Sequence, residues 1–465
     1  MFNERAIDIN GKSYNKTLMM FILLLGSFIT LLTETFLNNA LLTIMESFDI
    51  AQSEAQWLST GYLLIVGLMV PISAWVFKRF KSKTIYVSMI AIFLFGSFLG
   101  YIAPNFETLL IGRFIQAIGT GGLMPFVQNI VLVLYPPEKR GAALGTTGLV
   151  VAVAPAIGPT LSGLILAHYS WRMLFLVMTV LTAIIFITSL FTIKNITKNE
   201  AEKIDFQSVV YSTIGFGLLL YGLSSLGTPT TIGSALIYIS LGLVVVAIFA
   251  IRQKKIKNPL VNIDVFNNKQ FSLTTLLTSL ITISLLAVEL VLPLYLQDIR
   301  HETALLTGLV LLPGSIVMGI MNPITGRIFD KYGIKIVTII SFLLLSIGNI
   351  PMLFFNENTS LIVIVVSYAM RMFGISFGMM TTFTAAINSL PENLSVHGNA
   401  AASTLRQVAG SLGTGILTMV IALVTNATSN AGSSNFVSAY QAAFTVSLVL
   451  SLVGLALSFR LSSKK

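Results

Sequence analysis

The stretch LMMFILLLGSFITLLTETFLNNALLTIM, residues 18–45, contains a single ionisable side chain, that of Glu34. A run of roughly 20 apolar residues is long enough to cross the hydrocarbon core of a bilayer as an α-helix. A carboxylate inside such a helix is energetically costly and therefore marks a candidate functional site. Ser27, Thr30, Glu34 and Asn38 recur at helical spacing, so we expect a polar stripe that faces protein or a water-filled cavity rather than lipid.

The composition of the whole chain extends this expectation. Of the 465 residues, 55% are hydrophobic and 10% are charged, which predicts a polytopic membrane protein. The absence of cysteine excludes disulfides and thiolate metal sites, and three scattered histidines do not favour a metal site either, so we expect no cofactor. The polar segment 1–16 does not resemble a cleavable signal, and the first span is therefore expected to remain as an anchor.

Apolar runs broken at charges and turn residues predict fourteen helical spans of about 18 to 28 residues each. Strand signals are absent, so the predicted fold is all-α. The predicted spans are 18–45, 55–76, 84–103, 107–134, 141–167, 172–193, 206–225, 233–251, 271–296, 304–325, 336–355, 360–386, 399–425 and 438–459.

The 28 lysines and arginines test this number of spans, because cytoplasmic loops are enriched in basic residues. With both termini in the cytoplasm, only Arg172 and Arg300 fall in outer loops, and Arg113, Arg371 and Arg406 lie within spans. One span more or fewer would invert every later loop and destroy this asymmetry. The net charge of +10 therefore indicates membrane topology, with anionic lipid as a partner, and does not imply nucleic acid.

An internal repeat relates two of the loops predicted on the inner side. PISAWVFKRFKSK at 71–83 aligns without a gap to PITGRIFDKYGIK at 323–335, although chance similarity between two basic loops is an alternative. A genuine repeat makes spans 1–6 and 9–14 two halves in parallel register, with two spans inserted between them. The predicted organisation is a cytoplasmic segment 1–17, a six-helix half 18–193, a linker with two extra helices 194–270, a second six-helix half 271–459 and a cytoplasmic tail 460–465.

Only two of the eighteen acidic residues, Glu34 and Glu289, lie deep within predicted spans. Each stands about two-thirds of the way along the first helix of its half, and Glu289 ends a polar stripe of serines and threonines. Desolvation raises the pKa of a carboxyl group toward a range where it can bind and release protons. We therefore predict that one or both acids exchange a proton during transport; the alternative is a permanently neutral acid or a fixed arginine pair.

The arginines within spans repeat the same symmetry, because Arg113 and Arg371 each lie in the fourth helix of a half. An arginine beside an acid holds that acid ionised until the partnership is displaced, so the pair can act as a switch. For Arg371 and Arg406 the alternative is a structural charge satisfied by backbone carbonyls. The candidate residues of the substrate cavity are Glu34, Asn38, Tyr62, Gln128, Glu289 and Arg371.

The fifth predicted span contains GLVVAVAPAIGPTLSG, residues 148–163. Proline bends a helix because it removes an internal hydrogen bond, and small residues allow another helix to pack closely. The doubled pattern of prolines and small residues is more specific than either feature alone. Its candidate functional residues are Gly148, Pro155, Gly158, Pro159 and Gly163.

With these motifs the chain resembles the multidrug:proton antiporters of the major facilitator superfamily, in the fourteen-span subgroup of QacA/EmrB-like and lincomycin-exporter-like proteins. Residues 148–163 resemble the antiporter motif of that family, and 112–122 resemble its fourth-span motif, whose arginine, here Arg113, is implicated in proton coupling. Residues 326–335 are similar to its cytoplasmic gating loop. The resemblance implies gating roles for Gly326, Asp330, Lys331, Gly333 and Lys335.

Two positions depart from the pattern of this family. In the N-terminal copy of the gating loop, Phe77 or Lys78 replaces the acid and Lys81 replaces the glycine. In the first span the pattern Asp-x-Thr appears as Thr33-Glu34-Thr35, so the acid is shifted by one residue. A shift of one residue rotates a side chain by about 100° around a helix.

The sequence therefore predicts a proton-driven exporter of apolar or cationic drug-like molecules in the bacterial cytoplasmic membrane. It would work as a monomer by alternating access, with the proton motive force in place of a cofactor. The main alternative is export of an endogenous amphiphile such as a fatty acid or lipid precursor, which a basic cavity would favour. A channel is less well supported, and no metal-protease or serine-histidine motif indicates an enzyme.

Overall fold

The structure is a computed structural model that describes residues 5–197, 204–226, 232–430 and 436–462. It separates into two compact units, each of which we describe by itself. The first unit comprises Met1–Leu134, Val153–Val209 and Lys257–Val261, and the second comprises Tyr135–Ala152, Val210–Ile256 and Asn262–Lys465.

The first unit begins with a short antiparallel hairpin, β1 (Arg5–Ile7) and β2 (Ser13–Asn15). Apart from this hairpin of two three-residue strands, the regular structure of the described residues is helical, which confirms the predicted all-α fold. The Asp8 carboxylate accepts the backbone N–H groups of Asn10 and Lys12 at 2.9 and 2.8 Å and so closes the turn. The helices that follow are α1 (Lys16–Phe36), α2 (Leu41–Phe48), α3 (Gln52–Ala55), α4 (Trp57–Met69), α5 (Ser73–Arg79), α6 (Ser82–Tyr101), α7 (Phe106–Gly121), α8 (Leu123–Leu134) and α10 (Arg172–Thr192).

One long helix, α9 (Arg140–Leu166), passes from the second unit into the first between Ala152 and Val153. It carries the proline- and glycine-rich stretch. The other helices of the second unit are α11 (Phe206–Ser224), α12 (Ile232–Lys255), α13 (Lys269–Asp298), α14 (Ala304–Tyr332), α15 (Ile334–Asn349), α16 (Leu361–Asn388), α17 (Glu392–Asn430) and α18 (Phe436–Ser458). Short 3₁₀ turns are η1 (Asn38–Ala40), η2 (Pro137–Lys139), η4 (Ile263–Asn267) and η5 (Pro351–Phe354).

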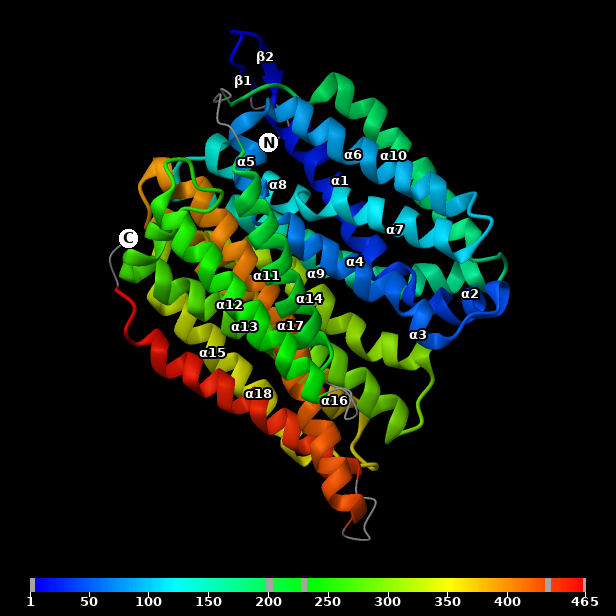
Figure 1. Ribbon diagram of the computed structural model, residues 1–465. Helices are drawn as coiled ribbons and strands as arrows, with labels where there is room; N and C mark the ends of the chain where they lie inside the picture. The colour runs from blue at the N-terminus through cyan, green and yellow to red at the C-terminus, as the bar shows by residue number, and fades with distance from the viewer. Residues whose placement is uncertain (1–4, 198–203, 227–231, 431–435, 463–465) are drawn as a thin grey trace. The chain divides into compact units, whose positions relative to one another are not determined.

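Small residues set the helix packing within each unit. In the first unit α6 packs between α7 and α10 (Figure 1). A Cβ on Gly96 would lie 2.6 Å from the carbonyl oxygen of Gly112, so only glycine permits this approach of α6 to α7. In the second unit α16 packs on α13, α14 and α15, and α13 also packs on α17 and α18. Most side chains of α16 are therefore buried.

The helices coincide with the fourteen predicted spans. Among the described residues, twelve helical segments are long and apolar enough to cross a membrane, and α4 and α5 meet the same criteria only as a pair, with a bend of 52° between them. The remaining predicted span, 141–167, coincides with the 27-residue α9. Since a bilayer core offers no partners for backbone groups, helices with internal hydrogen bonds are the form expected there.

Besides the second predicted span, 55–76, which is broken between α4 and α5, two more spans are divided, which corrects their predicted continuity. The first, 18–45, ends as an α-helix at Phe36, passes through η1 and resumes as α2. The fourth, 107–134, is divided at Gly122 into α7 and α8. Asn39 and Gly122 stand where these helices break, and both residue types are weak helix formers.

The two copies of the repeat differ in geometry. Pro71 lies at the bend between α4 and α5, whereas Pro323 lies inside the continuous helix α14. Gly333 ends α14 with a φ of 80°, a left-handed conformation that favours glycine. The aligned residue, Lys81, has an ordinary φ of −67°. The loss of glycine from the first copy therefore matches a real difference in the backbone.

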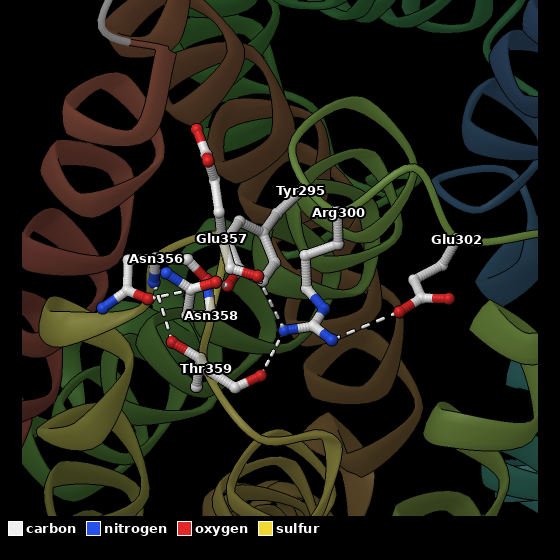
Figure 2. Close-up of polar contacts among 7 residues, drawn as sticks. All are labelled: Tyr295, Arg300, Glu302, Asn356, Glu357, Asn358 and Thr359. Carbon is white, nitrogen blue, oxygen red and sulfur yellow. Dashed lines mark hydrogen bonds and ion pairs between the residues drawn. The ribbon is translucent and has the colours of Figure 1, made fainter.

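A polar cluster ties the C-terminal end of α13 to the loop between α15 and α16. Figure 2 shows Arg300 between Glu302 and Thr359. Its guanidinium lies 3.2 Å from the Glu302 carboxylate and donates to the carbonyl oxygens of Glu357 and Thr359. The Tyr295 hydroxyl donates to the carbonyl of Asn356 at 2.7 Å. These contacts fix the end of the helix that carries Glu289.

Candidate functional site

The first unit holds Arg113 of α7 in a fully buried polar cluster. Its Nε donates to the carbonyl of Leu58 at 3.1 Å, and its Nη1 donates to the Gln116 amide oxygen at 3.1 Å and the Thr33 carbonyl at 3.4 Å. The guanidinium carbon lies 4.1 Å from the centre of the Tyr62 ring, a cation–π contact. These neighbours hold the charge of Arg113 in place without neutralising it.

Glu34 of α1 belongs to the same cluster, because it interacts electrostatically with both Arg113 and Tyr62. The Tyr62 hydroxyl also lies 2.9 Å from that of Thr120. Earlier on the predicted polar stripe, Ser27 and Thr30 are buried in protein, and their hydroxyls donate to carbonyls of their own helix. The stripe therefore faces protein, and Glu34 is its ionisable member.

The second unit contains a matching cluster around Arg371 of α16, which is fully buried. Its Nε donates to the Asn349 amide oxygen at 2.6 Å, and its Nη2 donates to the carbonyl and hydroxyl of Ser284 at 2.7 and 3.0 Å. Glu289 of α13 and Tyr368 of α16 both interact electrostatically with this arginine. Each unit thus joins the acid of its first span, the arginine of its fourth span and a tyrosine.

Each arginine also retains one buried nitrogen that has no hydrogen-bond partner among the described residues, Nη2 of Arg113 and Nη1 of Arg371. A buried donor without a partner is costly. Each guanidinium group can therefore donate a hydrogen bond to a further oxygen atom, such as that of a carboxylate or a water. The alternative that backbone carbonyls satisfy Arg371 holds for only part of its guanidinium.

Of the neutral members of these clusters, sequence reasoning identified Tyr62 and missed Gln116, Tyr368, Asn349 and Ser284. Gln116 lies three residues after Arg113, and Tyr368 lies three residues before Arg371, so both occupy the same helix face as their arginine. That spacing was the available signal. Asn349 and Ser284 come from other helices and carried no such signal.

Two further residues of the predicted cavity have separate positions. Gln128 is fully buried on α8 in the first unit. Asn38 begins the 3₁₀ turn that follows α1, and its side chain lies outside the described residues.

The glycines of the predicted antiporter motif are sites of close helix contact. A Cβ on Gly148 would lie 2.7 Å from Met380 Cγ of α16, and a Cβ on Gly158 would overlap the Thr35 hydroxyl of α1. Gly163 is less constrained, since the nearest atom to its Cβ would be 3.7 Å away. The side chains of Pro155 and Pro159 lie outside the described residues.

The predicted gating loop holds the N-terminus of α9. The two oxygens of the Asp330 carboxylate accept the backbone N–H groups of Gly141 and Ala142, each at 2.9 Å. We call these two bonds the α9 latch. A carboxylate is favourable there because the first N–H groups of a helix have no partners within it. Gly326 allows the approach, since a Cβ there would overlap the carbonyl oxygen of Gly141.

The lysines of the gating loop lie at the surface or close to it. Lys331 is exposed and lies over the Tyr332 ring at 5.1 Å, and Lys335 is partly exposed. In the N-terminal copy, Lys78 aligns with Asp330, and Phe77, which aligns with Phe329, packs on Phe126 at 5.9 Å between ring centres. The N-terminal copy therefore contributes to the core of its unit through an aromatic contact.

Arg406 of α17 differs from the other two arginines within spans. Its guanidinium lies over the Phe383 ring at 5.4 Å. Its Nη1 is buried and has no hydrogen-bond partner within the described part of the chain. A buried cation of this kind favours a negatively charged neighbour.

Comparison with known proteins places these features in context. Residues 23–414 match the family described as the Major Facilitator Superfamily. The chain is 42% identical over 416 residues to the uncharacterized MFS-type transporter YcnB of Bacillus subtilis (strain 168), with 89% of this chain and 88% of that protein covered. It is 37% identical over 423 residues to the lincomycin resistance protein LmrB of the same organism, with 89% and 87% covered.

A solved structure has a similar fold. The crystal structure of the human organic anion transporter MFSD10 (TETRAN) matches with a TM-score of 0.69 at 13% identity, and the match covers 95% of this chain and 99% of that one.

Proposed function

Because this chain belongs to the Major Facilitator Superfamily, we propose that it is a proton-coupled antiporter that exports apolar or cationic drug-like molecules across the bacterial cytoplasmic membrane. The family match and the twelve candidate spans make the chain a multi-pass bacterial membrane transporter of small molecules and not an enzyme. The relative named for lincomycin resistance supports a drug-like substrate. Protons, the surrounding lipid and a monomeric state are parts of this proposal.

One observation supports the proposed coupling of transport to protons. Each unit brings the acid of its first span beside the buried arginine of its fourth span, Glu34 with Arg113 and Glu289 with Arg371. The acids would be ionised while their arginine is near. Protonation would cancel the attraction and free the arginine, whose spare nitrogen then needs another ligand. Such an exchange is a switch between two arrangements of the same residues.

A cationic substrate would use the same carboxylates. The ionised carboxylate would attract the cationic substrate, and the protonated carboxyl group would release that substrate. Substrate and proton would therefore exclude each other from the site. Each proton that moves inward down a membrane potential supplies about 2.3 kcal/mol per 100 mV. We propose that this energy drives alternating access between the halves 18–193 and 271–459. The α9 latch would hold the N-terminus of α9 against α14 on the cytoplasmic side.

The test is dye efflux by protein reconstituted in vesicles with an imposed pH gradient, with Glu34→Gln and Glu289→Gln made singly and together. We expect each single variant to lose or alter coupled efflux while its thermal unfolding stays close to that of the wild type. Glu46→Gln, an exposed acid on α2, is the matched control and should transport normally. Full proton-coupled efflux by the double variant would refute the role of the carboxylates.

A second candidate is export of an endogenous amphiphilic anion such as a fatty acid. Arg406 favours it, because its buried guanidinium nitrogen has no partner among the residues described. The same vesicles separate the two candidates when a cationic dye is compared with a labelled fatty acid. Saturable efflux of the fatty acid alone, lost in Arg406→Gln, would favour the second candidate.

A further inference from the structure

The second unit contains a cavity of about 600 Å³ where the ends of several helices meet. It lies beside the segment that precedes α9, at the C-terminal ends of α14 and α16 and the N-terminal end of α13. Pockets that bind small molecules have volumes of about 300–1,000 Å³. The cavity is therefore large enough for a drug-sized ligand, and it is separate from Glu289 and Arg371.

The lining of this cavity specifies the chemistry of a ligand. Among the described residues that line it, the two charged ones, Glu138 and Asp330, are acids. Phe329 and Ile334 provide apolar walls, and Asn388 and Ser389 provide hydrogen-bonding groups. The complement to such a surface is an organic cation with an apolar body, since a free anion would be repelled by both carboxylates.

The cavity lies on the side from which an exporter takes its substrate. Several basic residues stand next to its lining residues in the sequence, and they are among those that predict cytoplasmic loops: Lys139, Arg140, Lys331 and Lys335. A ligand in this cavity has therefore not yet reached the acids within the spans.

The walls of the cavity are also the residues that hold α9. Asp330 forms the α9 latch. Asn388 accepts from Arg140 Nη1 at 3.1 Å and donates to the carbonyl of Pro137 at 3.3 Å. Glu138 interacts electrostatically with both Asp330 and Arg140. A cation placed among these groups would compete with the N-terminus of α9 for the Asp330 carboxylate.

We propose that this cavity is an entry site that binds organic monocations before transport, and that its occupation weakens the α9 latch. The inference rests on the proposed function for its direction of transport, but the binding site itself does not. The cation would draw the Asp330 carboxylate toward the cavity and away from Gly141 and Ala142. The arrival of substrate would thereby favour the release of the helix that carries the antiporter motif.

The experiment measures equilibrium binding of radiolabelled tetraphenylphosphonium to the purified full-length protein. Glu138→Gln removes one lining charge, and Ser389→Phe fills part of the cavity. We expect Glu138→Gln to weaken binding at this site by about fivefold or more, because fivefold is the effect of one unit charge about 4 Å away even when water screens it fully. Ser389→Phe should weaken binding because its ring occupies volume that the ligand needs. Glu357→Gln, an exposed acid in the loop between α15 and α16, is the matched control and should bind like the wild type.

The variant with both Glu34→Gln and Glu289→Gln distinguishes the entry site from the acids within the spans. We expect it to retain tetraphenylphosphonium binding that Glu138→Gln still weakens, even if it no longer transports. In transport assays Glu138→Gln should raise KM and leave kcat nearly unchanged. Unchanged binding and unchanged KM in both Glu138→Gln and Ser389→Phe, alongside active wild-type efflux, would overturn the entry site. Glu138-dependent binding by a wild type that moves no cation would support the site and refute the proposed function instead.

Discussion

Substitution of Asp330 tests the α9 latch directly. Asp330→Asn retains one acceptor oxygen but loses the charge and the second acceptor, whereas Asp330→Ala loses both hydrogen bonds of 2.9 Å. A side-chain cap contributes about 0.5–2 kcal/mol, and a carboxylate adds about 0.3–1 kcal/mol through the helix dipole. For this half-buried residue we expect losses of about 1 kcal/mol for asparagine and about 2 kcal/mol for alanine. The population with a released α9 should then rise about fivefold and about thirtyfold.

The absence of cysteine from the chain makes this population measurable. Met380 is 1% exposed and packs on Gly148 of α9. In a Met380→Cys background, the rate of maleimide alkylation therefore reports how often the N-terminal part of α9 leaves α16. We expect the rate to rise in the order wild type, Asp330→Asn, Asp330→Ala.

The matched control for this measurement is Asp264→Asn, which neutralises an exposed acid on η4. Its alkylation rate should equal that of the parent. Equal rates for Asp330→Ala and the parent would refute the latch, as would the same increase in the control.

Two further predictions concern stability in detergent, measured by thermal unfolding. Gly326→Ala should destabilise the protein by about 1–3 kcal/mol, because its Cβ would overlap a backbone carbonyl that cannot rotate away. Gly308→Ala on the same helix has nothing within 4 Å of its Cβ and should be neutral or stabilising; equal losses would contradict the close contact of α14 with α9. Arg300→Ala should cost about 1–2 kcal/mol because it removes hydrogen bonds to two carbonyls. Glu302→Gln, which removes only a partly exposed ion pair, should cost less than about 1 kcal/mol, and equal losses would assign the stability to the ion pair.

The helical segments were predictable because a membrane span is encoded by local composition. Every predicted span coincides with helix, and the polar stripe of α1 is buried from Ser27 to Thr30. Breaks within spans were not predictable in the same way. The run 18–45 stays apolar on both sides of η1, so hydropathy carries no signal for the end of α1 at Phe36.

The site was predictable where it depends on charge and missed where it depends on packing. A charged residue within an apolar span is visible in the sequence, and this signal found Glu34, Arg113, Glu289 and Arg371. Asn349 and Ser284 hold Arg371, but they are neutral residues that come from other helices. Their role depends on which helices are neighbours, and that is a property of the tertiary fold.

The displacement of Glu34 from the family pattern has a structural explanation within the first unit. The pattern places its acid at position 33, but the Thr33 hydroxyl donates to the carbonyl of Ile29 and to the sulfur of Met178 on α10. An acid at that position would face an apolar neighbour. Glu34, one residue further along the helix, interacts with Arg113 and Tyr62. A glutamate is one methylene longer than an aspartate, and Glu34 interacts electrostatically with Arg113 despite the rotation of about 100°.

The partners of the acid are therefore a better guide to equivalence between the halves than its register. Glu289 has the same kinds of partners as Glu34, an arginine of the fourth span and a tyrosine. The tyrosines differ in origin, since Tyr62 lies on the second span and Tyr368 on the fourth. The two halves therefore contain the same combination of acid, arginine and tyrosine, although the tyrosines occupy different positions in the sequence of each half. This supports a role for both acids, and it removes the objection that Glu34 stands one residue from its expected place.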